Sequence, residues 1–267
     1  MEEHPMSEPH ALYKVEESIA LITLNRPEAK NSFSPEMIEL WRTFLDEARA
    51  DETVRVLIVT GKGDTFCSGG DIRDMAMGKL RRWEMKKFLW EGVHRIALAL
   101  EDLDKPVLAA INGAAMGAGL DMALMCDLRI CSDQAKLSES YILLGLVPGD
   151  GGAYYLPRLV GLGKAFELLF TGDVLTPQEA LEIGLVNRVV PHDRLMEETM
   201  KFAQKIANQP PLAVRMMKRA VYQAQSSSLR SHLDYISSQL ALLSDTEDHQ
   251  EAAKAFIEKR RPVFQGK

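Results

Sequence analysis

Residues 106–131 read PVLAAINGAAMGAGLDMALMCDLRIC, and this stretch carries the pattern that decides the fold. It begins with a short apolar run over residues 106–111, which predicts a buried strand. A glycine-containing turn follows, and then an apolar segment that predicts a helix over residues 116–126. A second strand candidate covers residues 127–131. Because buried strands that alternate with helices are typical of parallel sheets, we predict an α/β fold.

The same alternation continues towards the N-terminus. Runs rich in β-branched residues over residues 19–24 and 54–60 predict two strands. Between them, Ser34 followed by Pro35 is a helix start signal for a periodic segment that ends near Ala50.

Directly before the opening stretch, the spacing over residues 83–103 predicts a helix. Thr176 and Glu179 form a capping box at the start of another helix, which Gly184 ends. Residues 186–190 are the last strand candidate, because everything beyond residue 192 has helical spacing. We therefore predict three parts, which are a disordered lead over residues 1–10, a core over residues 11–195 and a helical region over residues 196–267.

Composition excludes several classes of protein. The chain has 267 residues, of which 46% are hydrophobic and 26% charged, so it can bury a substantial core. Its 32 Lys and Arg against 38 Asp and Glu give a net charge of −6, which argues against nucleic-acid binding. No apolar run is long enough to span a membrane. The three cysteines suggest no disulfide framework or metal site, so a cytoplasmic location is expected.

Common catalytic motifs are missing from the sequence. We find no dinucleotide-binding glycine fingerprint after a strand, no phosphate-binding Walker loop, no nucleophile elbow and no zinc-binding His-Glu-x-x-His. Two glycine-bearing turns stand out instead, TFCSGGDI over residues 65–72 and GAAMGAGLD over residues 113–121. Small residues allow backbone N–H groups to approach a ligand closely. Two such groups that converge on one oxygen would form an oxyanion hole.

Short motifs spread over nearly the whole chain resemble those of the crotonase, or enoyl-CoA hydratase/isomerase, superfamily. They are Leu24-Asn25-Arg26-Pro27, FCSGGDI at 66–72, Lys105-Pro106-Val107, Ile111-Asn112-Gly113, GAGLD at 117–121, MCD at 125–127, GLVPGDGG at 145–152, Thr171-Gly172, residues 180–186 and FIEKRRP at 256–262. The resemblance implies a crotonase-like spiral of ββα units followed by a C-terminal helical oligomerisation region. It also implies an acyl-CoA substrate, no cofactor beyond the coenzyme A that the substrate carries, no metal, and a homotrimer or dimer of trimers.

The resemblance further assigns roles to the two turns. The backbone N–H groups of Gly70 and Ala118 would hold the thioester oxygen and stabilise an enolate. Ala118 stands where the family usually has glycine, but it keeps the N–H donor. Arg26 and Lys30 are candidate sources of positive charge for the CoA phosphates. The remaining candidates for substrate or CoA contacts are Ser68, Asp71, Ile72 and Gly117.

The acid–base residues depart from the family pattern of two glutamates. Asp121 occupies the first position, whereas Tyr141 occupies the second and cannot act as a carboxylate base. Glu139 and Asp150 are the nearby substitutes; Glu139 would reach the same side as Tyr141 if the segment were extended. Each candidate has an alternative role, since Asp150 could cap a helix, Glu139 could be exposed, and the Tyr141 hydroxyl could orient a substrate or water.

Enoyl-CoA hydration is the activity we expect, with two of the three carboxylates acting on water and on the α-carbon. Double-bond isomerisation is the main alternative, because one positioned carboxylate can remove and return a proton. Two further alternatives are hydrolytic cleavage of a β-dicarbonyl and non-catalytic acyl-CoA binding. The walls of the acyl pocket are expected from residues 75–89.

Overall fold

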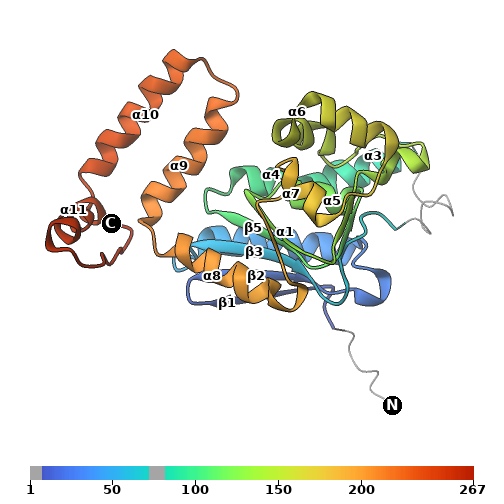
Figure 1. Cartoon of the computed structure of the whole chain (residues 1–267), viewed down its shortest axis with the longest axis horizontal. Helices are drawn as coiled ribbons and strands as arrows, with labels where there is room; N and C mark the ends of the chain where they lie inside the picture. Colours follow the sequence, from blue (N-terminus) through green and yellow to red (C-terminus); the bar gives the residue numbers. More distant parts are fainter. Residues whose placement is uncertain (1–7, 72–81) are drawn as a thin grey trace.

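The computed structural model describes residues 8–71 and 82–267, and a six-stranded sheet lies at its centre (Figure 1). The strand order is β1-β2-β3-β5-β7-β9. β1 pairs with β2 in antiparallel fashion, and all other neighbouring strands are parallel. The strands are β1 (Ala11–Glu16), β2 (Ile19–Leu24), β3 (Val56–Gly61), β5 (Val107–Ile111), β7 (Leu128–Ser132) and β9 (Arg188–Val190).

A second, parallel sheet has the order β4-β6-β8. Its strands are β4 (Thr65–Cys67), β6 (Ala114–Met116) and β8 (Lys136–Ser138). Each of them directly follows a strand of the large sheet, and a helical element is the next regular structure described after each. For example, β5 leads to β6 and then to α5 (Ala118–Leu124). This repeated unit of two strands and a helix confirms the predicted spiral of ββα units.

The large sheet is buried on both faces, as its parallel strands require. In β3, Leu57 and Val59 point to a core formed with α1 (Pro35–Ala50) and α4 (His94–Asp102), whereas Val56 and Ile58 point to a core on the other face. That second core includes Ala203 and other buried residues of α8 (Leu195–Ala207). Thus α8 belongs to the packing of the sheet, although it lies beyond the expected division at residue 195.

The helix start signals in the sequence are confirmed. Ser34 caps α1 (Pro35–Ala50) by accepting a hydrogen bond from the Met37 N–H. Thr176 caps α7 (Pro177–Glu182), and both halves of its capping box with Glu179 are present.

Three segments differ from the expectations. The helix predicted over residues 83–103 consists of α3 (Trp83–Phe88), a π-helical turn η2 (Leu89–Val93) and α4 (His94–Asp102). The helix predicted from residue 116 begins at Ala118, because Gly117 has a positive φ of 50° that stops strand β6 and precedes the helix.

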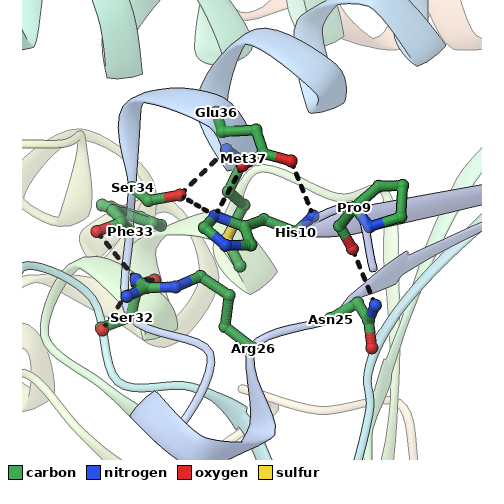
Figure 2. A network of polar contacts seen from close by, with 9 residues as sticks. All are labelled: Pro9, His10, Asn25, Arg26, Ser32, Phe33, Ser34, Glu36 and Met37. Carbon is green, nitrogen blue, oxygen red and sulfur yellow. Dashed lines mark hydrogen bonds and ion pairs between the residues drawn. The ribbon is translucent and has the colours of Figure 1, made fainter. Parts of the chain in front are cut away.

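The third difference concerns the lead over residues 1–10. His10 makes defined contacts: its ring contacts Ser34 and its backbone N–H donates to Glu36 (Figure 2). Its carbonyl oxygen accepts a hydrogen bond from the Asn25 N–H. Residues 1–7 lie outside the described residues.

The C-terminal helices extend away from the sheet (Figure 1). They are α9 (Pro211–Ala224), α10 (Leu229–Ser244) and α11 (Glu247–Glu258), while α6 (Gly152–Thr171) packs against α5. Two contacts join α9 to the start of β7, from the Tyr222 hydroxyl and from the Lys218 ammonium to the Asp127 carboxylate. The role of these helices in oligomerisation stays a prediction.

Candidate active site

A cavity of about 490 Å³ opens where the two glycine-bearing turns meet. Most of its wall is apolar, and its polar groups come from the two turns and from the segment before α6. The lining residues are Phe33, Pro35, Ser68, Gly70, Asp71, Met85, Phe88, Leu89, Met116, Gly117, Ala118, Ser140, Tyr141, Leu144, Leu146 and Asp150. The volume lies within the range of small-molecule sites in proteins.

The two turns are in direct contact with each other. A Cβ built on Gly69 would lie 3.0 Å from the Ala118 Cβ and 3.1 Å from the Ala118 backbone nitrogen, so only glycine fits there without a shift. Ala118 is the first residue of α5, where a backbone N–H has no partner within the helix. Neither Gly70 nor Ala118 donates its N–H to another described residue. Two N–H donors that have no partner among the described residues therefore belong to the lining of one cavity.

Tyr141 joins two of the predicted carboxylates. Its hydroxyl lies 2.7 Å from Asp121 Oδ2 and 2.9 Å from Asp150 Oδ2. Tyr141 belongs to the short 3-10 helix η3 (Ser140–Leu144), and its ring lies against Gly117 of the second turn. Asp150 and Tyr141 line the cavity, whereas Asp121 is fully buried and does not.

Glu139 is buried beside Asp121, with 2% of its surface exposed. A Cβ on Gly152 would lie 2.3 Å from Asp121 Oδ1 and 2.8 Å from Glu139 Oε2, so these two carboxyl groups meet at the start of α6. Both expectations for Glu139 are therefore wrong: it is not exposed, and it does not line the cavity beside Tyr141. The reason is that η3 begins directly after Glu139, so the extended alternation of side chains does not apply.

Asp150 does not cap α6. The N-cap residue is Gly151, and the start of the helix has no side-chain cap hydrogen bond. Asp150 points instead to Tyr141, and its Oδ1 lies 4.0 Å from His94 Nε2, which also bonds to the Gly149 carbonyl oxygen at 2.8 Å. Of the two roles left open for Asp150, the structure rules out the helix cap.

Burial dominates the electrostatics of this cluster. It raises the pKa of Asp121, although the hydrogen bond from Tyr141 acts in the opposite direction. It also raises the pKa of Glu139, and the neighbouring Asp121 charge raises that pKa further. The pKa of Asp150 is raised by burial against the lowering effects of Tyr141 and His94. Little positive charge lies near these three carboxyl groups among the described residues. Their protonated forms are therefore favoured.

The predicted binding residues fall into two groups. Ser68, Asp71 and Gly117 line the cavity, and Ile72 lies outside the described residues. Arg26 does not line it. Its guanidinium holds the loop before α1 by donating to the Ser32 carbonyl oxygen at 2.6 Å (Figure 2).

Lys30, the other predicted source of positive charge, does not line the cavity either. It forms an exposed ion pair with Asp64 at 2.8 Å.

Part of the cavity wall and one polar neighbour of Asp150 lie outside the sequence motifs. Phe33 and Pro35 of the α1 start line the cavity, and so do Leu144 and Leu146. No motif singled out these residues. Met85, Phe88 and Leu89 line the cavity from the stretch expected to supply the acyl pocket. His94 was missed because a lone histidine in a helix gives no signal of its contact with Asp150.

Within residues 8–71 and 82–267, no group of three or more His, Cys, Asp or Glu side chains is arranged to hold a metal ion. Over the same residues, no helix is both long and apolar enough to cross a bilayer. The cavity's polar groups are thus backbone N–H donors, carboxyl groups and hydroxyls, a set suited to acid–base chemistry on a carbonyl compound.

Comparison with known proteins identifies the family. The sequence profile of enoyl-CoA hydratase/isomerase matches residues 14–267. The chain belongs to the enoyl-CoA hydratase/isomerase family. It is 36% identical over 262 residues to crotonyl-CoA hydratase of Syntrophomonas wolfei, which covers 97% of this chain and 99% of that protein. The crystal structure of enoyl-CoA hydratase from Bacillus anthracis superimposes with a TM-score of 0.92 at 35% identity, covering 97% of this chain and 100% of the other.

Isomerases are also among the relatives of this enoyl-CoA hydratase/isomerase. The chain is 34% identical over 261 residues to 1,2-epoxyphenylacetyl-CoA isomerase of Escherichia coli, with 96% of this chain and 98% of that protein covered. Family membership and the crotonase fold are therefore established, while the choice between hydration and isomerisation depends on the acid–base groups.

Proposed function

We propose that this protein hydrates a 2-enoyl-CoA thioester, with the N–H groups of Gly70 and Ala118 holding the thioester oxygen and Asp150 moving the proton. One observation carries this proposal: the two N–H donors and the Asp150 carboxylate line the same cavity. Relatives named as hydratases support the substrate class.

The chemistry follows from charge development on the substrate. Attack of water at the β-carbon pushes electrons onto the thioester oxygen, and the two N–H donors stabilise the resulting enolate. Asp150 accepts a proton as the water O–H bond breaks and the C–O bond forms. A proton is then added to the α-carbon, which completes the addition of water. Ser68, Asp71 and Gly117 are the proposed contacts to the CoA portion.

Isomerisation of a double bond along the acyl chain is the second candidate. It is favoured by the observation that Asp150 alone among Asp121, Glu139 and Asp150 lines the cavity. One carboxylate is sufficient to take a proton from one carbon and return it to another. The isomerase relative is consistent with this alternative.

The test uses the purified wild-type protein with two substrates. Crotonyl-CoA should lose its enoyl absorbance in water, and a 3-enoyl-CoA should gain conjugated enoyl absorbance only if the protein isomerises. Calorimetry with coenzyme A reports binding independently of turnover. Loss of crotonyl-CoA supports hydration, exclusive turnover of the 3-enoyl-CoA supports isomerisation, and failure to bind coenzyme A rejects both.

We also propose that the protein assembles through its C-terminal helices as a homotrimer or a dimer of trimers. The helices expose several large apolar side chains, which are Met217, Val221, Leu229, Leu233, Leu240, Leu242, Phe256 and Ile257. Exposed apolar surface of this kind is typical of interaction sites. Light scattering of the full chain tests the proposal, and a monomer would reject it. A cytoplasmic location stays a prediction.

A further inference from the structure

The cavity presents a single predicted catalytic carboxylate to the substrate. Asp150 lines the cavity, but Asp121 is fully buried and Glu139 is 2% exposed, so neither reaches a bound acyl group directly. The proposed hydration nevertheless removes one proton from water and adds one to carbon. Asp150 can accept the water proton only when it is ionised, so the structure has to provide another place for the proton that burial favours on Asp150.

The Tyr141 hydroxyl, which bridges Asp121 and Asp150, indicates that this place is Asp121. The Tyr141 hydroxyl lies 2.7 Å from an oxygen of Asp121 and 2.9 Å from an oxygen of Asp150. A hydroxyl has one proton, whereas an ionised carboxylate can only accept. Both contacts are hydrogen bonds at the same time only when one carboxyl group is protonated and donates to the Tyr141 oxygen. The geometry therefore suits a pair of carboxyl groups that holds one proton.

We propose that Tyr141 passes a proton between Asp150 and Asp121, so that the buried Asp121 stores the proton of the pair while Asp150, left ionised, exchanges a proton with the substrate. This inference rests on the proposed function, because it deepens the acid–base part of that reaction. Asp150 is the catalytic residue, and Tyr141 and Asp121 are positioning residues that act through it.

Every proton is accounted for in the transfer. The resting pair holds one proton. When Asp150 carries it, Asp150 donates to the Tyr141 oxygen while the Tyr141 O–H proton moves to Asp121, so that Asp150 is ionised and Asp121 is neutral. The ionised Asp150 then takes a proton from water as the C–O bond forms and delivers a proton to the α-carbon, which leaves the pair with one proton again. No oxidant or additional reactant is needed.

The surroundings of the pair favour a single negative charge. Glu139 faces Asp121 and both of its oxygens are buried without a hydrogen-bond partner among the described residues. His94 on α4 faces Asp150 at 4.0 Å and is the one basic side chain within ion-pair distance of these carboxyl groups in the described part of the chain. Burial raises the pKa of Asp121 and of Asp150, which helps the pair to keep its proton at neutral pH.

The first test compares the pH–rate profiles of the wild type and Tyr141→Phe. The bridging hydroxyl stabilises the singly protonated pair, so its removal should bring the acid and alkaline limbs of the profile closer together. We expect kcat to fall at least roughly a hundredfold with little change in KM. Tyr154→Phe, on the exposed side of α6, is the matched control and should keep both limbs. Unchanged limbs in Tyr141→Phe would overturn the proposal.

The second test is Asp121→Asn, which replaces the proposed store with an amide of the same shape. We expect kcat for crotonyl-CoA to fall at least roughly a hundredfold even though Asp121 does not line the cavity. Asp173→Asn, an exposed aspartate after α6, is the control. Turnover of Asp121→Asn near that of the wild type would reject a store at Asp121.

A third measurement needs no turnover. Infrared spectroscopy of the wild type at neutral pH should show the carbonyl band of a protonated carboxyl group, and the band should shift in Tyr141→Phe because the acid loses its acceptor. No such band in the wild type, or an unshifted band in the variant, would contradict the shared proton. If the wild type has the band but does not turn over an enoyl-CoA, the proposed function fails and the proton bridge stands.

Discussion

Gly119 lies so close to Cys67 that a Cβ on Gly119 would be 1.9 Å from the Cys67 carbonyl oxygen. The contact joins the first residues of α5 to the end of β4. It thereby holds the N–H groups of Ala118 and Gly70 in the wall of the same cavity. Both groups in the contact are backbone, so neither can rotate away. The distance between the two turns therefore depends on the absence of a side chain at residue 119.

We expect Gly119→Ala to force these backbones apart and to lower the free energy of unfolding by about 1–3 kcal/mol, the usual cost of overpacking. Turnover should fall as well, because the two N–H donors separate. Gly163→Ala is the matched control, since a Cβ at that helical position would have no atom within 4 Å. It should leave stability equal or raise it by up to about 1 kcal/mol. Chemical denaturation and a crotonyl-CoA assay measure both effects, and a fully stable, active Gly119→Ala would contradict the expectation.

The oxyanion hole can be tested by removing one N–H donor without removing a side-chain group. Ala118 is the first residue of α5, a position at which helices tolerate proline. Ala118→Pro should therefore fold, yet it lacks the N–H and should lower kcat by about a hundredfold to a thousandfold. Glu247→Pro places proline at the same position of α11, far from the cavity, and should keep its activity. Equal kcat values in the two variants would show that the Ala118 N–H does not hold the oxygen.

Asp150→Asn tests the carboxylate that faces the substrate. The amide has the same shape but cannot accept a proton, so we expect kcat to fall at least roughly a hundredfold for hydration or for isomerisation. Asp173→Asn serves again as the exposed control. Steady-state kinetics with crotonyl-CoA and a 3-enoyl-CoA measure both activities, and near-normal turnover in Asp150→Asn would remove Asp150 from the mechanism.

Structural features that depend on residues close together in the sequence could be predicted, whereas those that depend on distant residues could not. Ser34 and Thr176 were identified correctly as helix caps, because a cap bonds to a backbone N–H only three residues away. Strand β1 (Ala11–Glu16) was missed. It lies at the sheet edge and most of its residues are exposed, so it lacks the apolar run that identifies a buried strand. The three-residue strands of the small sheet are too short to show a period at all.

The acid–base cluster was predicted in composition but not in arrangement. Sequence motifs located Asp121, Glu139, Tyr141 and Asp150, and the structure brings all four together. Their order from the cavity inwards could not be read from spacing. It depends on the 3-10 helix that follows Glu139 and on the positive φ of 119° at Gly151, which places Asp150 beside Tyr141 rather than at the helix end.

Glu139 leads to a prediction about stability and pH. An unfolded glutamate titrates near pH 4.3, whereas burial raises the pKa of Glu139 in the folded protein. Above about pH 4.3 the folded state therefore binds more protons than the unfolded state. The stability contributed by this difference is complete below that pH and is lost as the pH rises towards the raised pKa.

Glu139→Gln should remove this loss, because glutamine is neutral in both states. The free energy of unfolding of the wild type should decline with pH by up to about 1.4 kcal/mol per unit more steeply than that of the variant. Denaturant titrations at several pH values from 5 to about 9 measure the two slopes. Glu182→Gln, an exposed position on α7, is the control and should follow the wild type. The comparison depends on slopes, so a constant offset from the new amide does not affect it. Parallel curves for the wild type and Glu139→Gln would mean that Glu139 is ionised in the fold, which would require a positive partner that the described contacts do not provide.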